Sequence, residues 1–245
     1  MRVRSVNALC MRDVADGRGT RSWRWNRTTR NSRSVNSNVH SWPSCEDSSM
    51  VDTKMTKSVG EHWVCSMLAR HGWGAALTRD GLERTDILAV HTSETRPMVE
   101  VQVKTVQDLG AKTNWLLGTK SQSPERSEHE WFVLVSVPAS PLEVPRSYIV
   151  PRNHVAAAAY LAHMSWLTAP DVKPGTRNAG IDMARVNQDE WAWYENRWDL
   201  MLSPTSDCPV MLPEWLREAS LQKRVIDNAD FPWNHPWRDN PPVWG

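Results

Sequence analysis

A stretch of strict alternation near the middle of the chain constrains the fold most strongly. Residues 98–106 read MVEVQVKTV, in which valines alternate with a carboxylate, an amide and an ammonium at Glu100, Gln102 and Lys104. Successive side chains of a β-strand point to opposite faces, so the valines share one face and the polar groups share the other. The pattern predicts a strand with one buried face. Its polar face is either solvated or the floor of an active site.

Apolar patterns on both sides of this stretch predict further elements. Residues 130–138, EWFVLVSVP, are almost continuously apolar, which indicates a strand covered on both faces. A short polar loop separates residues 85–91 from the alternating strand and predicts antiparallel pairing. The other expected elements are helices at 58–72, 153–167, 188–201 and 212–224, and short strands at 73–79 and 147–151. This order predicts an α/β fold with a central mixed sheet of four to five strands flanked by helices.

Two of the predicted helices carry N-terminal capping signals. Ser58 is followed three residues later by Glu61, which is the spacing of a capping box. Asn153 is the expected N-cap of the helix at 153–167. Glu61 is therefore expected in the first turn of its helix, at the edge of the apolar stripe that faces the sheet.

The two ends of the chain differ from the part between them. Residues 1–55 are rich in Arg, Ser, Asn and Thr without a sustained apolar period, so we expect a disordered basic segment that adds nothing to the fold. Three interpretations stay open: a nucleic-acid-binding arm, a transit peptide, or translated sequence upstream of a start at Met50 or Met55. We expect a core over 56–165 and a helical, Trp- and Pro-rich C-terminal extension over 166–245.

Composition and charge narrow the class of protein. Four cysteines without metal-ligand or redox spacing fit a reducing, cytoplasmic environment. The sequence has no apolar run of the ~18 residues that a membrane span needs, so no membrane association is expected. Residues 1–40 hold nine Arg and two Asp, and since the whole chain carries +1, the remainder carries −6. An acidic body is unusual for a strong nonspecific DNA-binding protein.

Acidic and basic side chains are expected to meet beside the alternating strand. Asp86 begins the strand at 85–91, and neighbouring strands lie about 4.8 Å apart, so Asp86 can lie next to the polar face. Glu61 can point toward the same place from the preceding helix. Carboxylates are ligands of hard cations such as Mg²⁺, and a nearby lysine stabilises charge on a phosphate. This set of residues suits phosphodiester hydrolysis.

With these residues in this order, the chain resembles the PD-(D/E)XK nuclease superfamily. Glu61 in GEHWVCSMLARHGW, Asp86 in RTDILAV and Lys104 in VQVKT match its motif positions. Gln102 replaces the motif's acid, as in the similar Mrr-type and Holliday-junction-resolvase-like members. The resemblance implies a restriction-endonuclease-like core and a DNA endonuclease that uses Mg²⁺ or Mn²⁺ and forms a homodimer where it cuts both strands. It implies Asp86 as a metal ligand, Gln102 or Glu100 as a further ligand, Lys104 as the catalytic cation and Glu61 as support.

A second function remains open beside the first. The resemblance covers roughly residues 57–165, and each residue alone has a plain structural explanation: Asp86 fits a turn and Lys104 fits a solvated strand face. Some relatives have lost activity. The alternative is therefore a catalytically silent module of the same fold that binds nucleic acid or a protein partner. Convergence of Asp86, Gln102 and Lys104 on one open cleft would favour the enzyme.

Overall fold

The computed structural model describes residues 11–15, 21–25, 53–78, 82–173 and 175–226. The chain divides into two compact units, residues 1–48 and 49–245. In the first unit, β1 (Met11–Ala15) pairs antiparallel with β2 (Arg21–Trp25). Most of the segment 1–55 and the end of the extension expected over 166–245 lie outside the described residues, so the expectations about them stay predictions.

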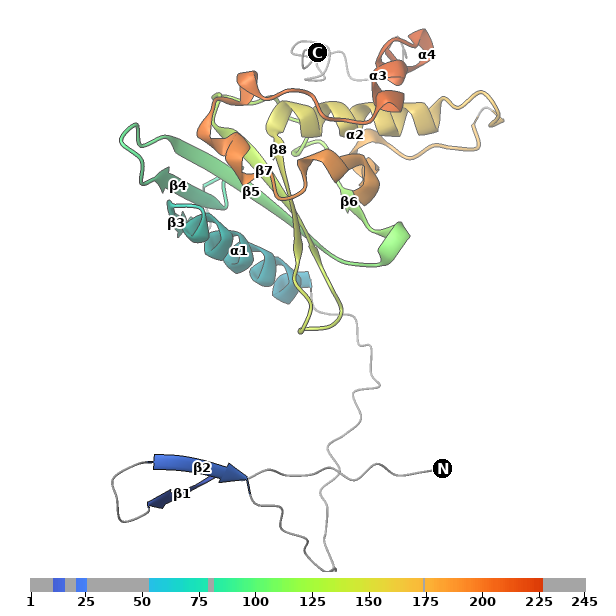
Figure 1. Ribbon diagram of the computed structural model, residues 1–245. Coiled ribbons are helices and arrows are strands. Elements are labelled where there is room, and N and C mark those ends of the chain that lie inside the picture. Colours follow the sequence, from blue (N-terminus) through green and yellow to red (C-terminus); the bar gives the residue numbers. More distant parts are fainter. Residues whose placement is uncertain (1–10, 16–20, 26–52, 79–81, 174, 227–245) are drawn as a thin grey trace, which may run out of the picture. The chain divides into compact units, whose positions relative to one another are not determined.

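A five-stranded mixed sheet forms the centre of the second unit (Figure 1). The spatial order is β3-β4-β5-β7-β8, in which β5 and β7 are parallel and the other neighbours are antiparallel. The strands are β3 (Trp73–Leu77), β4 (Ile87–His91), β5 (Met98–Gln107), β7 (Glu130–Val137) and β8 (Arg146–Pro151). The predicted α/β fold with a flanked mixed sheet is confirmed, as is the antiparallel pairing of β4 with β5.

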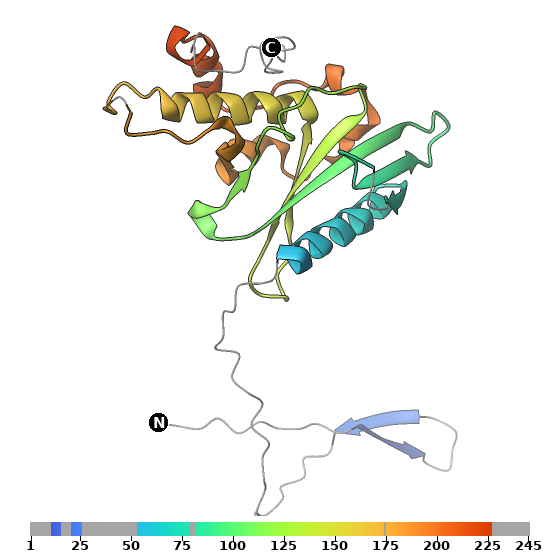
Figure 2. The same ribbon diagram turned by 180° about the vertical axis from the view of Figure 1, so that it is seen from behind.

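Helices α1 (Thr53–Arg70) and α2 (Arg152–Leu167) lie on opposite sides of this sheet, as both views show (Figures 1 and 2). The alternating valines of β5 are buried, and α1 packs against them through its own buried positions Gly60, Val64 and Leu68. Strand β7 is buried over all but its last residue. The apolar run therefore forms a strand that is covered on both faces, as predicted.

Shorter elements surround α2. Strands β6 and β9 form an antiparallel pair, in which Trp115 and Val186 are opposite each other and buried. The elements are η1 (Gly110–Lys112), β6 (Asn114–Leu116), η2 (Ile181–Met183), β9 (Arg185–Asn187), η3 (Gln188–Tyr194), η4 (Trp198–Leu202), η5 (Thr205–Asp207), α3 (Glu214–Ser220) and α4 (Lys223–Ile226). Among the helices of the described ranges, none has the length and apolarity that crossing a membrane requires.

Both predicted helix starts are wrong. Helix α1 already includes Thr53, because residues 53–57 continue the helix toward the N-terminus, so Ser58 is not its N-cap and Glu61 lies in the third turn. Helix α2 begins at Arg152 with Pro151 in the capping position. The Asn153 side chain instead accepts a hydrogen bond from the Glu125 backbone N–H at 3.1 Å.

The helix predicted over 188–201 is also wrong. The chain forms the two 3₁₀ helices η3 and η4, which are separated at Asn196, where φ is 56°. Left-handed backbone at Asn ends a helix. The Asn196 N–H donates to the Ser147 carbonyl at 2.8 Å, and Tyr148 and Glu195 form an isolated bridge. Pairing with the edge of β8 therefore replaces a continuous helix.

We expect the Gly60→Ala substitution to destabilise the protein. Ala stabilises the interior of an exposed helix by about 1 kcal/mol relative to Gly. Here, however, an added Cβ would overlap Thr105 Oγ1 and lie 2.9 Å from Thr105 Cβ, so rotation of the Thr105 side chain cannot relieve the overlap. Overpacking costs about 1–3 kcal/mol. Urea denaturation measures the change, and an unchanged or raised stability would show that α1 is not held against β5 at this point.

Acid is expected to destabilise the fold through His154. This buried ring contacts Tyr194 Oη at 2.8 Å through Nδ1, and burial lowers its pKa from 6.5 to about 4. The unfolded chain binds this proton more readily than the folded protein does. The contribution of His154 to the unfolding free energy is therefore complete above pH 6.5 and is lost as the pH falls toward 4. The contribution of this one group is about 2 kcal/mol between pH 7 and pH 5. Denaturation of wild type and His154→Gln at both pH values measures it, and an equal loss in both proteins would contradict the assignment.

Candidate active site

Asp86 is fixed directly before the first residue of β4, at the point where β5 continues beyond its partner. Its backbone extends the β4–β5 pairing by one residue, because its N–H donates to the Val101 carbonyl at 2.9 Å. Its side-chain Oδ2 then accepts a hydrogen bond from the Val103 N–H at 2.8 Å, in place of a further strand residue. The carboxylate is thereby held beside β5, as the sequence predicted, and its second oxygen is directed elsewhere.

A lysine from α1 joins two carboxylates at this point. Lys57 Nζ lies 3.2 Å from Glu61 Oε1 and 3.7 Å from Asp86 Oδ1. The Lys57 side chain is 60% exposed, whereas the Glu61 and Asp86 side chains are 18% and 22% exposed. Helix α1 therefore brings Glu61 to Asp86 from the neighbouring layer. The two carboxylates share one cation at the surface, which leaves the group with a charge of −1.

Lys104, on the polar face of β5, lies within electrostatic reach of Asp86. Burial lowers the pKa of Lys104, and the negative charge of Asp86 opposes this change, while the positive charges of Lys57 and Arg152 add to it. The backbone carbonyl of Lys104 accepts a hydrogen bond from Trp115 Nε1 at 3.0 Å. Lys104 is thus a half-buried ammonium held within electrostatic reach of Asp86. We call Glu61, Asp86, Lys104 and Lys57 the acid–lysine cluster.

Gln102 and Glu100 form their hydrogen bonds with residues outside the acid–lysine cluster. Gln102 Oε1 accepts a hydrogen bond from Arg152 Nη2 at 2.9 Å. Glu100 Oε2 accepts one from Thr85 Oγ1 at 2.9 Å. The polar face of β5 is therefore divided: Lys104 belongs with Asp86, whereas Gln102 points to the start of α2.

Behind Gln102 lies a buried ionic group that the sequence interpretation missed. Glu130 Oε2 is 2.5 Å from Arg152 Nε and 2.7 Å from Arg84 Nη2, and the Arg152 and Glu130 side chains are only 1% and 6% exposed. Arg152 also stacks on Phe132, with its guanidinium carbon 4.6 Å from the ring centroid. The sequence offered one signal for this pair: a charged residue borders each of two apolar strands. Glu130 is the first residue of β7, and Arg152 directly follows β8.

Charge in this group is unbalanced. Two guanidinium groups meet one carboxylate in an environment of low polarity, which leaves one excess positive charge. Burial, and next the charge of Arg84, lower the pKa of Arg152 to about 10, while Glu130 opposes the change. Arg152 Nη1 is a buried atom without a hydrogen-bond partner in the described part of the chain. Arg152 thus depends on Glu130, and Gln102 is positioned by Arg152.

The acid–lysine cluster contains donors that fit one hard cation. Mg²⁺ is usually held by one or two carboxylates, with water and phosphate oxygens filling the other positions. Glu61 and Asp86 are two such carboxylates, and the ammonium of Lys57 already interacts with both. Three or more acidic, histidine or cysteine side chains do not gather around a common point anywhere in the described ranges. The set therefore fits a cation that is bound in part by water and substrate.

Comparison with known proteins adds little. No protein-family model matches the sequence, and no curated protein matches it significantly. Among solved structures, a bacterial homing endonuclease is similar over 62% of this chain and 94% of its own chain, with 14% sequence identity and a TM-score of 0.39. A similarity of this size carries no argument about the fold or activity of this chain.

Proposed function

We propose that this protein is a metal-dependent DNA endonuclease whose reaction centre is the acid–lysine cluster. The observation that carries the proposal is that three separate elements supply the side chains: Glu61 and Asp86 share Lys57, and Lys104 lies within electrostatic reach of Asp86. These elements are α1, the residue before β4, and β5. This is also the motif order by which the chain resembles the PD-(D/E)XK superfamily. That resemblance supports DNA as the substrate and a homodimer as the form that cuts both strands.

In this proposal Asp86 and Glu61 hold Mg²⁺ or Mn²⁺, and Lys57 gives up its place between them. The bound metal would polarise the phosphate and lower the pKa of an attacking water. Asp86 is suited to its part because Val103 fixes one oxygen and leaves the other toward Glu61 and Lys57. Lys104, which is half-buried, stabilises the charge that develops on the phosphate.

Gln102 and Glu100 take different parts in the proposal. An amide oxygen has two lone pairs, so Gln102 Oε1 retains one acceptor site beside the bond from Arg152. Gln102 would contribute this site as a neutral ligand, and Arg152 would set its direction. Glu100 is bonded to Thr85, so it would assist through water.

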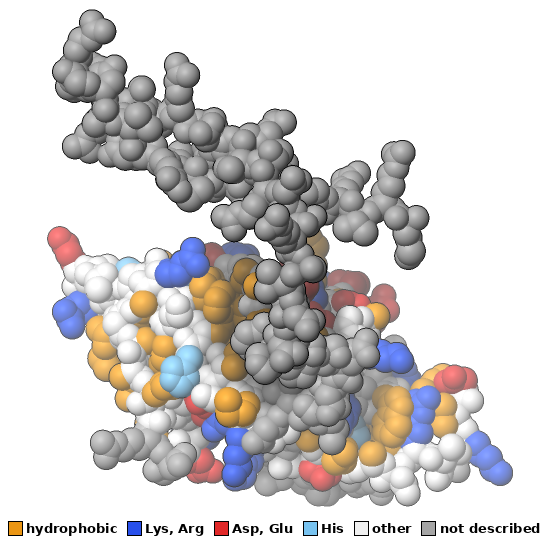
Figure 3. All heavy atoms as spheres, turned by 90° about the horizontal axis from the view of Figure 1, so that it is seen from below, with side chains coloured by type: hydrophobic (Ala, Val, Ile, Leu, Met, Phe, Trp, Pro, Cys, Tyr) orange, Lys and Arg blue, Asp and Glu red, His pale blue; other side chains and the backbone are white. Residues whose placement is uncertain are grey.

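The charge on the visible face supports a defined substrate contact better than general attraction to DNA. On the uncovered part of the face in Figure 3, basic and acidic side chains are interspersed and do not form one large basic area. Nonspecific DNA binding grows with the number of phosphates neutralised. We therefore expect weak, salt-sensitive DNA affinity that rises when the metal is bound.

The second candidate is the silent binding module of the same fold. Two observations favour it: an ammonium lies between the two carboxylates, and the neutral Gln102 stands where the motif has an acid. Incubation with supercoiled, linear, single-stranded and branched DNA distinguishes the two, with Mg²⁺, with Mn²⁺ and with EDTA. Metal-dependent nicking is expected. Binding of these DNAs without any cleavage in either metal would leave the silent module.

We expect Lys57→Met to lower the metal concentration required for half-maximal cleavage. The Lys57 ammonium competes with the metal for Glu61 and Asp86, and each exposed ion pair contributes up to about 1 kcal/mol, so the expected change is about fivefold. Lys173→Met, at an exposed site on another segment, is the matched control. A metal titration measures the effect. A fall in the rate at saturating metal would instead make Lys57 part of the reaction.

A further inference from the structure

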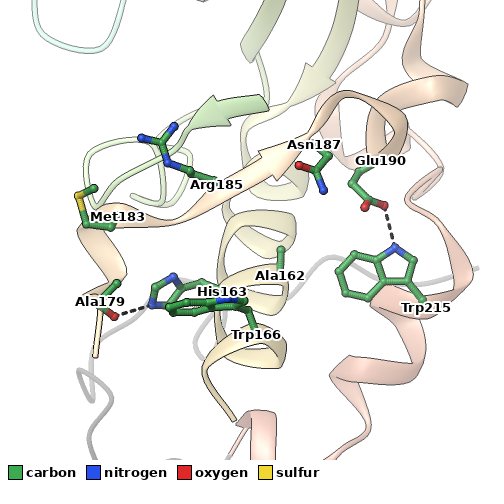
Figure 4. A pocket seen from close by; sticks show the side chains of 9 residues that line it. All are labelled: Ala162, His163, Trp166, Ala179, Met183, Arg185, Asn187, Glu190 and Trp215. Carbon is green, nitrogen blue, oxygen red and sulfur yellow. Dashed lines mark hydrogen bonds between the residues drawn. The ribbon is translucent and has the colours of Figure 1, made fainter. Parts of the chain in front are cut away.

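A cavity of about 480 Å³ lies between α2, β9, η3 and α3, formed by residues outside the acid–lysine cluster (Figure 4). Its size falls within the ~300–1,000 Å³ typical of small-molecule sites. Ala162 of α2 forms a small floor between its two side walls. The cavity therefore has room for a flat group inserted from the surface.

The two walls are aromatic. On one side lie His163 and Trp166 of α2, with ring centroids 5.6 Å apart, and on the other side lies Trp215 of α3 (Figure 4). Trp166 and Trp215 are 42% and 39% exposed, and the Arg177 guanidinium carbon lies 5.0 Å from the Trp166 ring centroid, so Arg177 covers part of Trp166 and the rest of its exposed surface is available to a base. His163 Nε2 is bonded to the Ala179 carbonyl at 3.0 Å, which fixes its ring. Aromatic walls of this kind stack with planar bases.

The rim carries three polar side chains in a defined order. Arg185 and Asn187 are two residues apart on β9, and Glu190 follows in η3, so guanidinium, amide and carboxylate succeed one another along one side (Figure 4). Glu190 Oε2 accepts a hydrogen bond from Trp215 Nε1 at 2.7 Å, which ties the carboxylate to the aromatic wall. Arg185 Nη1 donates to Asn114 Oδ1 at 3.0 Å, and a guanidinium has further N–H groups.

We propose that this cavity binds a guanine base. The edge of guanine presents two neighbouring donors, N2–H and N1–H, followed by two acceptors, O6 and N7. Glu190 accepts from the donors, Asn187 donates to O6, and Arg185 donates to N7, which is a common arginine contact to guanine. Adenine presents an acceptor at N1, where it would face the carboxylate. The rim order thus selects guanine, and the aromatic walls hold its ring.

Two sources of guanine fit this chemistry, a free nucleotide and an unpaired base in single-stranded nucleic acid. Arg185 also lines a second cavity of about 370 Å³ together with Lys112, Asn114 and Thr56. Cationic and hydroxyl groups there suit a sugar-phosphate chain that leaves the base pocket. Base binding itself requires none of the residues that we propose for cleavage.

Calorimetry in EDTA tests the proposal, with GMP, AMP, CMP and UMP and with five-nucleotide single strands that carry one central guanine or adenine. We expect GMP or the guanine strand to bind at least tenfold more tightly than its adenine counterpart. If only the free nucleotides show a preference for guanine over adenine, the ligand is a free nucleotide. If only the oligonucleotides show it, the ligand is single-stranded nucleic acid. Equal affinity for guanine and adenine in both arms, or no binding in either, overturns the proposal.

Single substitutions distinguish the contribution of the aromatic walls from that of the polar rim. Glu190→Gln should lower guanine affinity about tenfold and remove the preference over adenine. Trp166→Ala should weaken both bases about tenfold and keep the preference, so it tests the site even if the first variant fails to fold. Trp193→Ala, at an exposed position outside the cavity, is the control. Asp86→Asn should bind guanine as wild type does, so a failure of the cleavage proposal would leave this result unchanged. Wild-type selectivity in Glu190→Gln would overturn the rim assignment.

Discussion

The Glu130→Gln variant is expected to lose about 3–5 kcal/mol of unfolding free energy, because removing one partner of a buried ion pair leaves the other charge uncompensated. Here the loss concerns two guanidinium groups, since Arg84 and Arg152 both bind Glu130 Oε2. The other oxygen, Oε1, accepts the Arg126 N–H at 2.7 Å, and an amide can keep only one of these roles. Urea denaturation at pH 7 measures the loss.

Two further variants test the origin of this effect. Glu143→Gln, at an exposed position, is the matched control and should leave stability within about 0.5 kcal/mol. Adding Arg152→Met to Glu130→Gln should recover part of the loss, because it removes one of the uncompensated charges. If Glu130→Gln alone were as stable as wild type, the buried ionic group would not be the support for Gln102 that we describe.

The Asp86→Asn variant is expected to lower the rate of DNA cleavage at least a hundredfold. Altering an outer partner of a metal ligand already costs about 10–100-fold, and Asp86 is proposed as a ligand itself. The substitution keeps an oxygen that accepts the Val103 N–H, so the fold should be retained. Rates at several metal concentrations measure the effect, because a weakened ligand also raises the concentration of metal required.

Two controls accompany this variant: its own melting temperature and the same substitution at a distant, exposed aspartate. The melting temperature of Asp86→Asn should remain within a few degrees of wild type, and Asp171→Asn, at an exposed site, should cleave normally. Wild-type cleavage by Asp86→Asn would show that the acid–lysine cluster is not the reaction centre. If Glu100→Gln lost cleavage while Asp86→Asn retained it, Glu100 would be the ligand, and the reaction centre would lie nearer the start of β5.

Alternation and apolar runs were sufficient for the architecture. The valines of β5 face α1 because a strand has a period of two, and β7 is interior because its apolar side chains require cover on both faces. Both properties are local in the sequence. The ends of the helices were not predictable in the same way, because Asn196 ends η3 through a bond to Ser147, which is 49 positions away.

The candidate site shows the same division. From the sequence alone, residue type and order placed Asp86 beside β5 and Glu61 on the covering helix, since strand pairing and helix packing follow from short-range patterns. Only the tertiary structure decided which partner each polar group takes. Gln102 is bound to Arg152, Lys57 joins Glu61 to Asp86, and Glu130 forms an ion pair with Arg84. Gln102–Arg152 and Arg84–Glu130 lie 50 and 46 positions apart in the chain, and the energy of a charge depends on what surrounds it in space, which no local pattern records.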